Sequence, residues 1–78
     1  MSYIAITTYH ASMALDHNNA TMALATGDTM EDLASAVIDA PEFADGGDGC
    51  VLVNDGEHFR WMTDNEHEAW HDALMMAS

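Results

Sequence analysis

The stretch that decides the fold is GDTMEDLASAVIDAP, residues 27–41. Its apolar side chains recur at the three- and four-residue spacing of one helix face, at Met30, Leu33, Ala34, Val37 and Ile38. Asp28 or Thr29 can cap the start of this helix, because Glu31 or Asp32 follows three residues later, and Pro41 stops it. The stretch therefore predicts an amphipathic helix that follows a strand ending at Gly27.

The chain before this helix predicts a β-hairpin. Residues 3–15 and 20–26 have strand length and are rich in Ile, Thr and small side chains. Between them Asn18-Asn19 tolerates the left-handed conformations that a tight hairpin turn needs. The apolar positions change face partway along the first strand, so we expect a bulge or bend near residues 8–12.

The chain after Pro41 predicts a second hairpin and a second helix. A glycine-rich acidic loop over residues 42–49 leads to the apolar run Cys50–Val53, and Asn54-Asp55-Gly56 is a strong turn signal within a hairpin over residues 50–62. Thr63 or Asp64 then caps a helix that ends at about Met76. The predicted order is ββαββα, an α+β fold in which two helices back a small, mostly antiparallel sheet, within one domain of residues 1–78.

The charge balance excludes several classes of partner. Fourteen Asp and Glu stand against Arg60 and no Lys, which gives a formal net charge of −13. Ordinary nucleic-acid binding and binding to anionic membranes both need Lys and Arg, so neither is expected. With one cysteine, no basic leader and no long apolar run, the sequence favours a cytoplasmic protein, a monomer or small homo-oligomer without a cofactor.

The acidic residues gather in three places away from the core pattern. Asp28, Asp32 and Asp39, with Glu31 beside them, share a face of the first helix, and Asp64, Glu68 and Asp72 follow one another at i, i+4 and i+8 on the last helix. Neighbours at that spacing are about 6 Å apart and destabilise an isolated helix by a few tenths of a kcal/mol per pair. The third group lies in the loop and the hairpin turn. The candidate partner-binding residues are Asp28, Glu31, Asp32, Asp39, Asp45, Asp48, Asp64, Glu68 and Asp72.

One interpretation of this pattern is that the protein imitates a polyanion. Carboxylates held at intervals comparable to those of backbone phosphates can occupy the basic groove of a nucleic-acid-binding protein without any catalytic residue. With a single Arg60, two carboxylate rows and one compact domain, the chain resembles the small acidic nucleic-acid mimics that bacteriophages use against host defences, the anti-CRISPR and anti-restriction proteins. The resemblance implies a non-enzymatic inhibitor in the host cytoplasm, whose target is a CRISPR effector complex or a restriction enzyme.

Two other interpretations remain open. Proteins of salt-loving organisms are also acidic and poor in Lys, so an acidic interaction or housekeeping domain of a halophile has the same composition. In addition, His67-Glu68-Ala69-Trp70-His71 matches the H-E-x-x-H pattern of zinc proteases. No downstream His or Glu follows His71, and a third ligand would have to come from His10, His17, His58 or a carboxylate. We therefore favour packing of the two imidazoles beside the buried stripe, with zinc binding as the distant alternative and no metal assigned.

Overall fold

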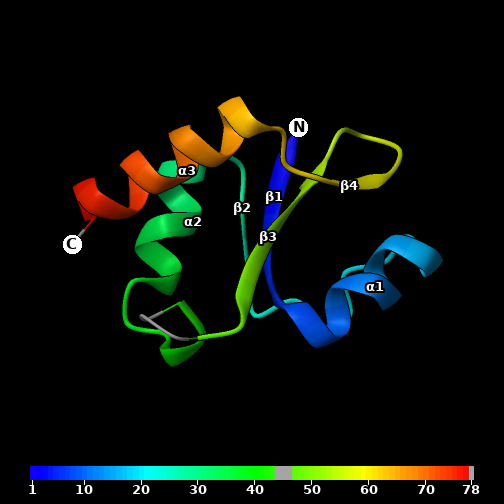
Figure 1. Ribbon diagram of the computed structural model, residues 1–78. Coiled ribbons are helices and arrows are strands. Elements are labelled where there is room, and N and C mark those ends of the chain that lie inside the picture. The colour runs from blue at the N-terminus through cyan, green and yellow to red at the C-terminus, as the bar shows by residue number, and fades with distance from the viewer. Residues whose placement is uncertain (44–46, 78) are drawn as a thin grey trace.

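The computed structural model describes residues 1–43 and 47–77 as a four-stranded antiparallel sheet with helices on both faces (Figure 1). The strand order is β2-β1-β3-β4. Along the chain the elements are β1 (Ser2–Thr7), α1 (Thr8–His17), β2 (Ala25–Gly27), α2 (Met30–Val37), a 3₁₀ turn (Pro41–Phe43), β3 (Gly49–Asn54), β4 (Phe59–Trp61) and α3 (Asp64–Ala77). The α+β class is confirmed, although the described order is βαβαββα with three α-helices.

The two central strands are buried on both faces of the sheet. β1 and β3 pair along their whole length, from Ser2 opposite Asn54 to Thr7 opposite Gly49. Ile4, Ile6 and Leu52 pack toward α1, whereas the side chains between them pack toward the opposite layer. This double burial explains why the sequence of β3 is an uninterrupted apolar run instead of an alternating one.

The larger core lies between the sheet and the layer formed by α2 and α3. Leu33 and Val37 of α2 meet Trp70 of α3 over Val51 and Val53 of the sheet. Figure 1 shows α2 and α3 together on one side of the strands and α1 alone on the other. The result is a three-layer arrangement in which two packed helices form one outer surface.

The first predicted hairpin is wrong, because residues 8–17 form α1. The predicted bend is the place where β1 ends at Thr7 and the helix begins at Thr8. Asn18 does adopt the left-handed conformation, with φ 51°, but it ends a helix and does not turn a hairpin. Its side-chain amide donates to the carbonyl of Glu57 at 2.7 Å and accepts from the N–H of Phe59 at 3.0 Å. Asn18 therefore ties the end of α1 to the β3–β4 hairpin.

The other elements agree with the sequence and show which caps are used. Thr29 caps α2, with its Oγ1 accepting from the N–H of Asp32 at 3.1 Å. The predicted stop at Pro41 is wrong, because the helix ends at Val37, and Ile38, expected on its apolar face, is 36% exposed. Gly27 precedes this helix so closely that a Cβ there would lie 2.8 Å from the backbone nitrogen of Leu33. In the second hairpin, the left-handed φ of 110° at Gly56 forms the predicted turn.

Candidate interaction surface

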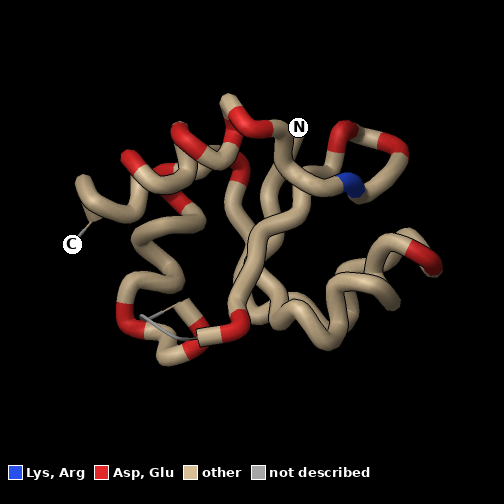
Figure 2. Tube along the Cα trace, in the orientation of Figure 1, with Lys and Arg blue, Asp and Glu red and all other residues tan. Residues whose placement is uncertain are grey.

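The acidic row on the last helix is exposed along its length. Asp64, Glu68 and Asp72 all lie within α3 and all face solvent. Trp70 and Ala73, which are 7% and 4% exposed, fix the opposite face of α3 on the core. Figure 2 shows acidic positions following α3 and continuing around α2. The row is thus held on a packed helix and not on a loop.

The acids near the first predicted helix are distributed differently from the expectation. Glu31 and Asp32 lie in the first turn of α2 and are exposed. Because the helix spans only Met30–Val37, Asp28 precedes its cap and Asp39 follows its end. A single helical row of Asp28, Asp32 and Asp39 is therefore wrong. These carboxylates instead surround α2, which packs against α3.

The two loop candidates do not join these rows. Asp45 lies outside the described residues. Asp48 is exposed, and its carbonyl accepts from the backbone N–H of Thr8 at 2.8 Å and from the Thr8 hydroxyl at 2.7 Å. Asp48 therefore belongs to the end of the sheet where α1 begins, whereas α3 crosses the other end (Figure 1).

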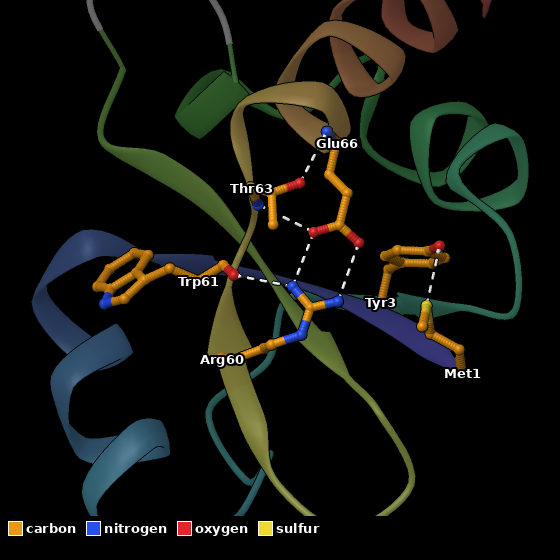
Figure 3. A network of polar contacts seen from close by, with 6 residues as sticks. All are labelled: Met1, Tyr3, Arg60, Trp61, Thr63 and Glu66. Carbon is orange, nitrogen blue, oxygen red and sulfur yellow. Dashed lines mark hydrogen bonds and ion pairs between the residues drawn. The ribbon is translucent and has the colours of Figure 1, made fainter.

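Arg60 forms an intramolecular ion pair at the surface. Its guanidinium donates two hydrogen bonds to Glu66, at 2.7 Å and 3.1 Å, and a third to the carbonyl of Trp61 at 3.1 Å (Figure 3). Figure 2 shows this position as the single basic one, on β4. Within residues 1–43 and 47–77, Arg60–Glu66 is the only ion pair. No Lys or Arg side chain is left over to neutralise the exposed rows.

Glu66 has a structural role that the sequence analysis missed. Its carboxylate also accepts from the N–H of Thr63 at 2.9 Å, while the Thr63 hydroxyl accepts from the N–H of Glu66 at 3.2 Å. This is a capping box, and its signature Thr63-x-x-Glu66 is readable in the sequence. Hydrogen bonds from Arg60, followed by the one from the Thr63 backbone, lower the pKa of Glu66 from 4.5 to about 2.

Asp55 is likewise a structural acid and not a surface candidate. Its Oδ1 accepts from the N–H groups of Glu57 and His58, at 3.1 Å and 3.0 Å. These two hydrogen bonds, led by the one from His58, lower the pKa of Asp55. The carboxylate thus closes the β3–β4 turn.

The H-E-x-x-H segment lies on the exposed side of α3. His67 and His71 are both exposed and, with Glu68 and Asp72, line a shallow hollow. Their packing at the boundary beside the buried stripe stays a prediction. His10 and His17 are on α1, across the sheet from this hollow. Across the described chain, no three His, Cys, Asp or Glu side chains are grouped so that they could hold a metal ion. The zinc-protease interpretation gains no third ligand.

Cys50 is half-buried on β3 beside the α1 core. Burial raises the pKa of its thiol, although a hydrogen bond with Thr8 acts in the opposite direction. This environment is that of a packed side chain and not of a nucleophile.

In the part of the chain that the structure describes, no helix has the length and apolar character needed to cross a bilayer. Comparisons with protein-family models, curated proteins and solved structures found no match. The case for a function rests on the surface described above.

Proposed function

We propose that the protein is a non-enzymatic inhibitor that occupies the basic, nucleic-acid-binding cleft of another protein. The observation that carries this proposal is that the one Arg is already paired, whereas the acidic row on α3 faces solvent. Arg60 is paired with Glu66, while Asp64, Glu68 and Asp72 stand exposed on α3 without a Lys or Arg partner among the described residues. Stability alone would favour Lys at some of these positions, because like charges four residues apart repel.

The packing of α2 and α3 supports binding by the whole surface. Carboxylates on elements that are already ordered lose little conformational freedom on association, so less binding energy is spent on ordering. Their summed field also attracts a basic cleft over about a Debye length, 10 Å at 0.1 M salt. Such a surface gains the same electrostatic steering as the nucleic acid that it replaces.

The resemblance to phage-borne acidic mimics favours a host defence complex as the target. A CRISPR effector complex or a restriction enzyme has a long basic channel for DNA or for a guide-paired strand. Occupying that channel blocks substrate binding without any reaction. The proposal therefore assigns the protein no enzymatic activity and places it in the cytoplasm of the host cell.

Affinity capture from a bacterial lysate at about 0.1 M salt tests the proposal. We expect the immobilised protein to retain a nucleic-acid-binding complex that is displaced both by added salt and by duplex DNA. Retained proteins that are indifferent to DNA would contradict mimicry.

A pair of charge-matched variants shows whether position matters. The first removes the α3 row with Asp64→Asn, Glu68→Gln and Asp72→Asn. The control removes three acids elsewhere, with Asp16→Asn, Glu42→Gln and Glu57→Gln. We expect the first variant to lose capture of the complex and the control to keep it. Equal loss in both would mean that net charge, and not an acidic surface, is responsible.

A further inference from the structure

A second feature lies on the other side of the sheet, where α1 and the segment after it form an open cavity of about 280 Å³. Four of the side chains that line it carry ligand atoms for metals: the imidazoles of His10 and His17 and the thioethers of Met13 and Met22. No carboxylate lines the cavity, although the chain has fourteen. The donor set is therefore neutral and partly sulfur.

From this donor set we infer that the cavity binds one monovalent copper ion, Cu(I). Thioether sulfur is a soft ligand that selects Cu(I), and imidazole also suits copper, whereas Mg²⁺, Ca²⁺ and Mn²⁺ require carboxylate and carbonyl oxygens. The ligands are Met13, His17 and Met22, with His10 as the fourth.

The spacing along α1 brings these donors to one side of the helix. His10 and Met13 are three residues apart, and Met13 and His17 are four residues apart, so each pair consists of neighbours on the helix surface. Met22 reaches the same cavity from the segment that follows the helix. Met13 and Met22 are 50% and 48% exposed, so an incoming ion can reach these residues from solvent.

Hydrogen bonds fix the segments that carry the ligands. His10 Nδ1 lies 3.0 Å from the Thr7 hydroxyl, which orients the ring and leaves Nε2 for the ion, as is common for metal-binding histidines. On the Met22 side, the N–H of Leu24 donates to the carbonyl of Ala5 on β1 at 2.7 Å. One side of the cavity is thus held by a side-chain hydrogen bond and the other by a backbone hydrogen bond to the sheet.

The charge of the protein favours cation entry without adding hard ligands. A net charge of −13 raises the local concentration of cations around the molecule. Within residues 8–26, which include all four donors, Asp16 is the single acid. Selection for Cu(I) over divalent ions therefore comes from the thioethers and not from the overall charge.

Anaerobic competition between the protein and a chromophoric Cu(I) chelator measures the affinity directly. We expect the wild type to remove one Cu(I) per chain from the chelator. The variant Met13→Leu/Met22→Leu keeps the side-chain volume, and its affinity for Cu(I) should fall at least tenfold. Met75→Leu/Met76→Leu removes two methionines on α3 and should bind as the wild type does. No uptake, or equal uptake by the Met13→Leu/Met22→Leu variant, would overturn the inference.

A measurement on the wild type alone makes the test independent of how the variants fold. Ag(I) is a redox-inert substitute for Cu(I), and methyl NMR spectra follow each methionine separately. We expect one equivalent of Ag(I) to shift the methyl signals of Met13 and Met22. Shifts confined to Met75 and Met76, or to the rings of His67 and His71, would place the ion on α3 and refute the site. Zn²⁺ binding as tight as that of Cu(I) would refute the argument from thioether ligands.

Discussion

Replacing Glu66 with Gln should destabilise the protein more than replacing any exposed acid with its amide. The change keeps a side chain of similar size but removes the charge that pairs with Arg60 at 2.7 Å and accepts from the Thr63 N–H at 2.9 Å. Exposed ion pairs contribute up to about 1 kcal/mol, and this bidentate pair, with side chains 36% and 20% exposed, belongs near that upper value. Weakening the cap costs about 0.5 kcal/mol more. We therefore expect a loss of about 1.5 kcal/mol in the free energy of unfolding.

Urea unfolding followed by tryptophan fluorescence measures this loss, because Trp70 is buried in the core between α2, α3 and the sheet. Glu68→Gln is the matched control, since it makes the same chemical change two residues away on the same helix. Glu68 stands between Asp64 and Asp72, so its neutralisation relieves repulsion and should leave stability unchanged or raise it by a few tenths of a kcal/mol. Equal losses in the two variants would refute the structural role of Glu66.

The effect of Glu66 must also depend on pH. Its pKa is lowered from 4.5 to about 2 on folding, so the unfolded chain binds a proton more readily than the folded protein does. Glu66 therefore contributes its full stabilisation above about pH 5, and the contribution disappears as the pH falls through about 2. The difference between the wild type and Glu66→Gln should shrink over that range. A difference that persists undiminished at pH 2 would contradict the assigned pKa shift.

Three further predictions follow from other contacts. Asn18→Ala should cost about 2 kcal/mol, because it removes two hydrogen bonds to the hairpin and leaves in the left-handed region a residue without the short polar side chain that lets Asn adopt it. Asn18→Gly should cost about 1 kcal/mol less in the same urea assay, because Gly has no Cβ; equal costs would contradict the backbone part of the argument. The Cys50 thiol, whose pKa burial raises, should react with a disulfide reagent at pH 8 much more slowly in the native protein than in urea, and equal rates would show that β3 leaves it accessible. The protein should stay folded when KCl is lowered from multimolar to 0.1 M, whereas a domain that is acidic for life in high salt would unfold.

The elements with clear caps and large buried side chains could be predicted from the sequence. α2 presents Leu33 and Val37 at helical spacing behind the Thr29 cap, and α3 does the same with Trp70. α1 gives no such signal, because its buried residues are Ala11 and Ala14, while Tyr9 is 78% exposed. Small buried side chains leave a weak periodic pattern, so a segment with Thr and Tyr resembles a strand.

The candidate surface could be predicted only in part, because a local sequence pattern does not show which residues of different elements come together. The row Asp64, Glu68 and Asp72 needs nothing beyond one helix, and it lies where the spacing places it. The pairing of Arg60 with Glu66 depends on how α3 follows β4, which no local pattern specifies. The cavity beside Met13 could not be predicted either, because it exists only when residues 8–17 form a helix.

The position of Arg60 makes trypsin digestion a measure of local opening in this protein. Trypsin cuts only after Lys and Arg, and this chain offers it one such bond, between Arg60 and Trp61. That bond lies within β4, and the Arg60 side chain is engaged by Glu66. Cleavage therefore requires β4 to detach, and under conditions where opening and closing are fast its rate follows the population of the open form. A single cut would release α3 as one peptide. The ratio of intact to cut chain would therefore measure how often the last helix separates from the sheet.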